Sequence, residues 1–303
     1  FRKAANYCIA HSIHFDAHIK GDTDALQLFR AVAATFQAQL VYAGGFVTLV
    51  VDDQIADEGD IRLFSPANTI AEDEGGPHFS YEGTSKSSRS TAAEVSFVDA
   101  SNFYERGHVL VEDYGAIDRY GYNLTKIRAL GCTSRQQAER MGRYTVATNT
   151  LNTETVTFKA GPEAATLLPG DVVLVLDKLK TGVESGGRII SATTTSITTD
   201  RTLTSATYST GNWFVYHYGS SGVTQKRAIS SVSGSTITIS GSFDSLPSSM
   251  GLWAIVNEDA VRQKPLYRVQ TLKENGDGSF QVIAILYNHQ KYSYINNSGS
   301  INM

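Results

Sequence analysis

Residues 188–256 carry one pattern twice: Arg188-Ile-Ile-Ser191, Ser196-Ile-Thr-Thr-Asp200 and Trp213-Phe-Val-Tyr216 are followed by Arg227-Ala-Ile-Ser230, Ser235-Thr-Ile-Thr-Ile-Ser240 and Trp253-Ala-Ile-Val256. The runs are rich in β-branched and aromatic residues, and Ser, Thr and Gly separate them, which is typical of short strands joined by turns. An internal repeat indicates one structural unit used twice. Two copies of three strands predict an inserted all-β domain over residues 177–263, a small sandwich or barrel of about six strands.

Further strands flank this region on both sides. Downstream, the runs 267–272 and 280–286 alternate apolar and polar residues, and Asn275-Gly-Asp-Gly278 joins them, which predicts a β-hairpin. Upstream, residues 153–159 have the composition of a strand, and Leu168-Pro-Gly-Asp171 predicts a turn that leads into another strand.

A helix is expected before these upstream strands. Residues 133–144 have few strand-forming residues, and Ser134 followed by Gln137 has the spacing of a capping box. Residues 94–99 and 109–112 have the composition of strands. We expect residues 93–176 and 264–295 to form one module.

The N-terminal module, residues 1–92, is expected to contain a strand, a helix, a hairpin and loops. Residues 13–19 alternate apolar and polar side chains, the period of a half-buried strand. A helix with Asp22 as its N-cap follows, and the residues of its apolar stripe are Leu26, Phe29, Val32, Ala33, Phe36 and Leu40. The runs 39–42 and 46–51 flank Gly44-Gly45 and predict a hairpin. Residues 296–303 are expected to be a tail.

The composition excludes several classes of protein. A chain of 303 residues with 41% hydrophobic residues is globular and predicts two or three domains. A formal net charge of −4 provides no basic field for phosphates, so no direct nucleic-acid binding is expected. No apolar run is long enough to predict a membrane span. Cys8 and Cys132 are expected to be free thiols. The chain starts at Phe1 without Met, and we expect a fragment of a longer polypeptide.

The candidate metal ligands are His14, Asp16 and His18. In a strand these three side chains lie on one face, and imidazole and carboxylate groups are suitable metal ligands. Such a metal could be shared across a symmetric assembly. The alternative is the solvent-facing side of an amphipathic strand, and this alternative agrees better with ordinary strand patterning.

Carboxylates and aromatic residues suggest two further sites. Residues 52–74 are acidic but lack the spacing of a calcium loop. Glycosidases need two facing carboxylates, and the candidates for that role are Asp99, Glu105, Glu112, Asp113 and Asp118. Trp213, Tyr216, Tyr218 and Trp253 could form a sugar-stacking platform, although aromatic residues at equivalent positions of a repeat are more often core residues. The sequence has no hydrolase, zinc-protease or nucleotide-binding motif, so we expect no enzyme and no cofactor.

Several of these segments together resemble a known family. Ser134–Arg143, with its Gln-Ala and Gly-Arg pairs, precedes Glu154–Phe158 and Leu168–Val172, and the chain closes with Tyr287-Asn-His-Gln-Lys-Tyr292. This series resembles the tip attachment (host specificity) protein J family of lambda-like phages. The resemblance spans nearly the whole chain, and its most specific motifs lie between residues 115 and 176 and between 265 and 292. It implies an α+β fold, predominantly β, with mixed strand-and-helix domains similar to phage baseplate hubs.

The resemblance also implies a function. Such a protein is expected to be a structural component of the virion tail tip, made in the bacterial cytoplasm, which closes the tail tube and carries host-recognition modules. It is expected to form a trimeric ring and to contact other tail-tip and tail-tube proteins. A host receptor would be reached only through C-terminal regions that this chain does not contain. The alternative is a carbohydrate-binding or cell-wall-degrading tail component.

Overall fold

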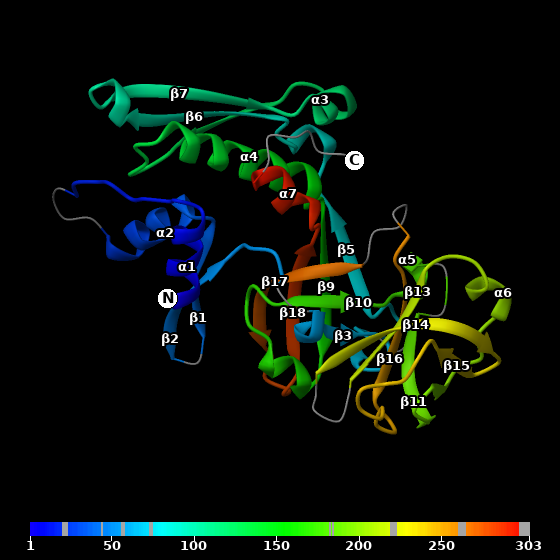
Figure 1. The fold of residues 1–303 in the computed structure, drawn as a ribbon. Coiled ribbons are helices and arrows are strands. Elements are labelled where there is room, and N and C mark those ends of the chain that lie inside the picture. The colour runs from blue at the N-terminus through cyan, green and yellow to red at the C-terminus, as the bar shows by residue number, and fades with distance from the viewer. Residues whose placement is uncertain are drawn as a thin grey trace. The chain divides into compact units, whose positions relative to one another are not determined.

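The computed structural model describes residues 1–19, 24–43, 45–55, 58–72, 75–181, 183, 185–218, 223–259 and 265–296. Strands outnumber helices in it (Figure 1). The chain divides into two compact units: unit 1 comprises Phe1–Gln54, Gly83–Glu154 and Asn288–Met303, and unit 2 comprises Ile55–Glu82 and Thr155–Tyr287. The module boundaries expected near residues 92, 176 and 263 stay a prediction.

The N-terminal part of unit 1 is a small α/β layer. Its elements are α1 (Arg2–Ala10), α2 (Ala25–Thr35), β1 (Ala38–Ala43) and β2 (Phe46–Val51). The two strands form the predicted antiparallel hairpin. The core residues are Ala4, Tyr7, Ile13, Ala33, Phe36 and Ala38.

The predicted helix is confirmed, but its ends differ from the expectation. The Asp24 carboxylate accepts a hydrogen bond from the Leu26 amide and caps α2, whereas the expected cap Asp22 lies outside the described residues. The helix ends at Thr35, because Gln37 adopts a left-handed conformation with φ of 55° and the chain then enters β1. Leu40 therefore belongs to a strand, although it continues the apolar stripe.

The prediction of a strand over residues 13–19 is wrong. The segment is not part of any sheet. The Gln137 side chain holds it instead, since Gln137 Nε2 donates to the His14 carbonyl (2.9 Å) and Gln137 Oε1 accepts from the His14 amide (3.2 Å). The Asp16 amide donates to the Gly131 carbonyl. These contacts satisfy the extended backbone without a neighbouring strand.

The rest of unit 1 is a three-stranded sheet with helices. The strands are β6 (Ala92–Asp99), β7 (Glu105–Glu112) and β8 (Leu124–Arg128), in the order β7-β6-β8. The helices are α3 (Tyr114–Tyr120), α4 (Arg135–Leu151) and α7 (Gln290–Asn296). Helix α4 packs on β6 and β7 (Figure 1). A Cβ at Gly142 would lie 2.7 Å from Val111 Cγ2, so the glycine allows this close approach.

The capping-box prediction for α4 is only half right. Ser134 is the N-cap residue, as predicted, but its side chain makes no capping hydrogen bond. Gln137 is buried, and its side chain binds the His14 backbone instead of the helix start. Both side chains have the spacing that a capping box needs, but tertiary contacts use one of them elsewhere.

Unit 2 contains a seven-stranded sheet. Its strands are β3 (Arg62–Phe64), β4 (Thr69–Ile70), β5 (Phe79–Gly83), β9 (Glu154–Ala160), β10 (Val172–Val175), β17 (Leu266–Glu274) and β18 (Phe280–Leu286). The order is β3-β10-β17-β18-β9-β4, and β5 pairs with β9. The β17–β18 hairpin confirms the prediction made from Asn275–Gly278. Phe158, Val173, Tyr267 and Val282 lie in its core.

The sequence repeat forms a closed six-stranded barrel, which confirms the barrel alternative. The first copy supplies β11 (Gly186–Ala192), β12 (Ser196–Thr199) and β13 (Trp213–Tyr218), and the second supplies β14 (Thr224–Ser233), β15 (Thr236–Ile239) and β16 (Leu252–Asn257). The order is β11-β12-β15-β14-β13-β16. Equivalent register shifts occur in both copies, between Ile189 and Ser191 and between Ile229 and Ser231. Such bulges bend strands, and here they do so at matching positions of the repeat.

Short helices complete the fold. They are α5 (Lys178–Thr181), α6 (Ser205–Tyr208) and the 3-10 turns at Glu58–Asp60, Lys86–Ser88, Ala100–Asn102 and Pro162–Thr166. Within the described ranges, no helix combines the length and the apolar character that crossing a membrane would need.

Candidate functional site

The structure does not gather the predicted metal ligands into a site. His14, Asp16 and His18 are exposed on the extended segment, and the Asp16 carboxylate accepts a hydrogen bond from the Thr133 hydroxyl (2.7 Å). Among the residues that the structure describes, no group of three or more His, Cys, Asp or Glu could hold a metal ion. The three side chains would share one face only in a strand, and residues 13–19 do not form one. A metal shared between copies stays a prediction.

The candidate catalytic carboxylates fall into two separate places. Asp99 and Glu105 are directly opposite each other at one end of the β6–β7 hairpin, and Glu112 is paired with Ala92 at the other end. Seven residues of strand separate Glu105 from Glu112 by roughly 23 Å, more than twice the carboxylate spacing of glycosidases. Buried Asp113 caps α3 through the amides of Gly115 and Ala116, and burial raises the pKa of its carboxyl group.

The sugar-platform hypothesis is wrong, because both tryptophans are buried in the barrel. Trp253 is fully buried and Trp213 is 7% exposed. The indole of Trp253 donates to Asp200 Oδ1 (3.0 Å), and that of Trp213 donates to the Thr210 carbonyl (2.7 Å). Their faces pack in the barrel core with Ile237 and Ile255. No stacking surface is left on them for a sugar.

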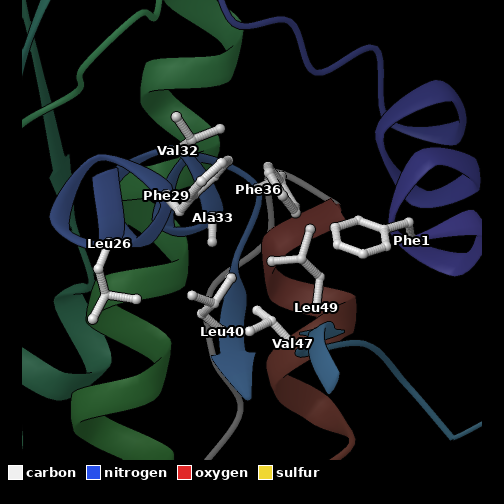
Figure 2. Close-up of a pocket in the computed structure, with 9 residues that line it drawn as sticks. All are labelled: Phe1, Leu26, Phe29, Val32, Ala33, Phe36, Leu40, Val47 and Leu49. Atoms are coloured by element: carbon white, nitrogen blue, oxygen red, sulfur yellow. The ribbon is translucent and has the colours of Figure 1, made fainter. Parts of the chain in front are cut away.

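The main surface feature of unit 1 is an apolar groove in its N-terminal layer. Figure 2 shows its side chains converging from the start of α1, from α2 and from both strands of the hairpin. The groove has a volume of about 370 Å³ and is lined by Phe1, Leu26, Phe29, Val32, Ala33, Phe36, Leu40, Val47 and Leu49. Ala33 and Phe36 are buried, whereas Phe29 is 60% exposed and Phe1 is 72% exposed. We define this set of nine residues as the apolar groove.

Charged residues of both signs lie close in sequence to the lining of the apolar groove. Arg2 and Lys3 follow Phe1 directly, and all three residues are exposed. Exposed Arg30 comes four residues after Leu26, so it lies on the same side of α2. Asp24 is the acidic residue nearest in sequence, and its carboxylate is engaged at the helix N-terminus. The lining of the groove is therefore apolar, and its sequence neighbours carry both signs of charge.

The second exposed feature is the turn between β6 and β7, which forms one end of the long ribbon in Figure 1. Phe103 is 94% exposed and Tyr104 is 68% exposed. Both adopt left-handed backbone conformations, with φ of 51° and 61°. Such conformations cost about 1–3 kcal/mol each for bulky residues and are concentrated at functional positions. We define Phe103 and Tyr104 as the aromatic tip.

The hydrogen bonds of Asp99 fix the aromatic tip. Its carboxylate accepts from the Ser101 amide (2.9 Å) and the Ser101 hydroxyl (2.6 Å), and these bonds lower the pKa of Asp99. The Tyr104 amide donates to the Asp99 carbonyl (2.8 Å). Asp99 also stands opposite Glu105, so two carboxylates flank the tip. The two rings are therefore presented on a fixed turn, with exposed Arg106 next to Glu105 and the charge of Arg135 acting on Asp99.

A buried polar cluster joins three elements of unit 1. Asp52, just after β2, forms an ion pair with Lys291 of α7, which is 1% exposed. The hydroxyl groups of Tyr144 in α4 and Tyr292 in α7 donate to the same carboxylate, each at 2.7 Å. The Lys291 ammonium lies 4.4 Å from the centre of the Tyr144 ring. The Lys-Tyr end of the closing motif thus holds α7 against α4 and the end of the N-terminal layer.

The barrel contains a buried imidazole. His217 on β13 is fully buried, and neither ring nitrogen has a hydrogen-bond partner among the described residues. Its ring packs edge-on against Phe243 with centroids 4.6 Å apart. Burial lowers the pKa of His217, so the neutral form is favoured. This side chain acts as a core aromatic group that resists protonation.

Comparison with known proteins assigns the family. The chain belongs to the family of putative phage tail proteins, whose model matches residues 24–191, more than half of the 303 residues. It is 29% identical over 290 residues to tip attachment protein J of Escherichia phage SECphi27 and 27% identical over 291 residues to that of Escherichia phage SECphi4. These matches cover 92% and 94% of this chain. The resemblance to the protein J family is thereby confirmed.

The chain spans about a quarter of the length of these relatives, 23% and 24%. A chain in a solved virion of a native gene transfer agent particle has the same fold, with a TM-score of 0.50 and 14% identity over 95% of this chain and 47% of that one. The predicted α+β, strand-dominated fold with a barrel is confirmed. The relatives place the protein among structural components of phage tails.

Sequence reasoning missed both exposed surfaces. Leu26 and Phe29 were assigned to one apolar stripe together with Ala33 and Phe36, and the sequence did not show that the first two stay exposed while the last two are buried. Phe103 and Tyr104 carried no signal, because only the backbone angles and the exposure of a known fold distinguish them from an ordinary turn.

Proposed function

We propose that this chain is part of the central hub of a phage or prophage tail tip, which closes the tail tube and carries host-recognition modules. The observation that supports it most is the similarity to two tip attachment proteins over more than nine tenths of the chain. The exposed apolar groove and aromatic tip are surfaces that an assembly can bury, because soluble monomers seldom expose contiguous apolar patches of this kind.

The proposed assembly is a trimeric ring in contact with other tail-tip and tail-tube proteins. The protein works by shape and association, without catalysis, cofactor or direct contact with nucleic acid. The modules 1–92, 93–176 with 264–295, and 177–263 are retained as the proposed division. Host receptors are reached through other parts of the longer protein.

The copy number of the protein in purified tails tests this proposal. Quantitative mass spectrometry of peptides from this chain, measured against peptides of the tail-tube protein, is expected to give the low copy number of a single terminal ring. Electron microscopy of tails labelled with an antibody against the barrel is expected to place the label at the end away from the capsid. Labelling along the whole tube, or absence from purified tails, would contradict the proposal.

A further inference from the structure

We propose that each half of the six-stranded barrel carries an interaction surface for a second copy of itself, so that two identical halves would close the same barrel. We define residues 185–217, which contain β11, β12 and β13, as half A. Residues 225–257, which contain most of β14 and all of β15 and β16, are half B. In the native chain, half B covers this surface of half A. The inference goes beyond the proposed function and does not depend on it.

The strands of the two halves are interleaved around the barrel with twofold symmetry. The order is β11-β12-β15-β14-β13-β16, and it is unchanged when each strand of half A is exchanged with the corresponding strand of half B. The neighbours of β13 are β14 and β16, both from half B, and the neighbours of β16 are β11 and β13, both from half A. Each half therefore depends on the other half for both neighbours of its third strand.

Two strand pairs cross the pseudo-twofold axis. Ile197 of β12 lies opposite Ile237 of β15. Val215 of β13 lies opposite Ile255 of β16. Both pairs join residues 40 positions apart in the chain. In an antiparallel pair of equivalent strands, a residue opposite its own equivalent lies on the twofold axis. A single offset of 40 residues therefore relates half A to half B.

Hydrogen bonds between the halves occur in matching pairs. The Thr199 amide donates to the Ser235 carbonyl (2.7 Å). The same offset maps this bond onto a second one, from the Ile239 amide to the Thr195 carbonyl (3.0 Å). Two further bonds with this relation are Leu203 N to Gly234 O (2.8 Å) and Phe243 N to Thr194 O (2.9 Å). Such reciprocal contacts define the interface between two copies of one unit.

The apolar core of the barrel repeats at the same offset. The equivalent pairs are Ile189 and Ile229, Ala192 and Val232, Ile197 and Ile237, Leu203 and Phe243, Trp213 and Trp253, and Val215 and Ile255. Tyr208 and Ile239 are exceptions, since their equivalents are Ser248 and Thr199. Cores tolerate exchanges of apolar side chains when the pattern and the total volume are kept. A second half A would thus supply most of the core that half B supplies.

The two halves differ in one register. Gly187 of β11 lies opposite Trp253 of β16. The offset would place Arg227 of β14 opposite Trp213, but it lies opposite Val215, two residues further along β13. This difference concerns the pairs between first and third strands, so the two pairs on the axis keep their symmetry.

Close packing at the start of β11 decides which half can replace the other. A Cβ at Gly186 would lie 3.1 Å from Leu176 Cδ1 and 3.3 Å from Ser65 Cβ, and both of these residues lie outside the barrel. The equivalent of Gly186 is Lys226, so half B would bring a lysine into this contact. Half A brings only a glycine to the position of Lys226. The combination that the structure allows is therefore a second half A in place of half B.

The test is a full chain in which the sequence of residues 185–217 also occupies positions 225–257. The variant loses the ion pair between Lys226 and Glu258 but keeps the strand pairs. Protection of β12 and β13 from hydrogen exchange is therefore expected to stay within about a hundredfold of the native chain. Tryptophan is kept at positions 213 and 253, so the fluorescence emission is expected to remain that of buried indoles.

The matched control places the sequence of residues 186–218 in the same positions. Its length and composition are almost the same, but the shift of one residue moves every strand side chain to the opposite face. Its β12 and β13 peptides are expected to exchange as fast as an unfolded segment. Loss of protection in the first variant, or equal protection in both, would overturn the inference.

An exchange of four side chains tests the symmetry without replacing a segment. The Phe243 ring packs edge-on against His217 of the other half, with centroids 4.6 Å apart. The offset assigns Leu203 and Asn257 as their equivalents. L203F/F243L and H217N/N257H each separate the aromatic pair, whereas the four substitutions together rebuild it on the other side of the axis.

The variant with all four substitutions is expected to have a higher unfolding temperature than either double variant, because only the complete exchange restores the ring contact. Tryptophan fluorescence follows this transition, since both tryptophans lie in the barrel core. If the complete exchange unfolds at or below the temperature of either double variant, the two sides of the barrel are not equivalent and the inference fails.

Discussion

Removing the Lys291 ammonium is expected to loosen the centre of unit 1. Lys291 is 1% exposed and Asp52 is 17% exposed, so the pair is largely shielded from water. Breaking a buried pair by removing one partner costs about 3–5 kcal/mol, because the remaining charge stays buried. In K291M the Asp52 carboxylate keeps two tyrosine donors and some access to solvent, which places the expected cost near the lower end, at about 3 kcal/mol.

The D52N variant is expected to cost more, about 4 kcal/mol, because the remaining ammonium is the more deeply buried group. The double variant D52N/K291M should cost less than the sum of the two single variants, since it leaves no unpaired charge. The matched control is K126M: Lys126 also pairs with a carboxylate, that of Glu94, but its side chain is 76% exposed, so little change in stability is expected.

Hydrogen exchange followed by mass spectrometry is the appropriate assay, because both tryptophans lie in the barrel and their fluorescence does not report on unit 1. K291M should lower the free energy of opening in peptides from α4, α7 and the β1–β2 hairpin, and peptides from the barrel should keep their protection. If both K291M and D52N change this free energy by less than about 1 kcal/mol, the cluster is no more than a surface ion pair and the reasoning is refuted.

Two further outcomes follow from buried positions. Burial lowers the pKa of His217 in the folded barrel, whereas the histidine of the unfolded chain titrates near pH 6.5. The free energy of unfolding should therefore fall as the pH drops below about 6.5, until the lowered pKa of the folded state is reached. H217F should reduce this loss, measured by thermal unfolding followed by tryptophan fluorescence. An unchanged pH dependence in H217F would contradict this. G142A adds a Cβ that would lie 2.7 Å from Val111 and 3.2 Å from Val95, so it should destabilise unit 1 by about 1–3 kcal/mol in hydrogen exchange, although alanine is the better helix former. A stabilised G142A would show that β6 and β7 can move away from α4.

Local patterns predicted the elements whose neighbours are also close in sequence. The β17–β18 and β1–β2 hairpins were accessible because turn residues specify pairing between adjacent segments. The barrel was accessible because a sequence repeat indicates one structural unit used twice. The wrong strand at residues 13–19 shows the limit of this approach. Its alternation correctly placed Ile13 inside, but Ile19 is 48% exposed, and the partner of the His14 backbone is Gln137, more than a hundred residues away.

The same limit applies to the site. The closing motif was visible as a family signature, yet the role of Lys291 depends on Asp52, which lies 239 positions earlier. The spacing of apolar residues and the composition carry no information on such pairs.

The tryptophans were open to two interpretations, and burial of both side chains decided for the core. The carboxylate candidates were close in sequence, but the structure divides them between the two ends of the β6–β7 hairpin, with Asp99 and Glu105 at one end and Glu112 at the other.

The first and last strands of the barrel are hydrogen-bonded neighbours, with Gly186 opposite Ala254. The strands β10 and β17, which precede and follow the barrel, are likewise paired, with Val172 opposite Arg268. The polypeptide therefore leaves the sheet and returns to it through adjacent points, an arrangement that tolerates large changes of the intervening segment. A different cassette could occupy this position, or none at all, while the sheet beneath it keeps its register.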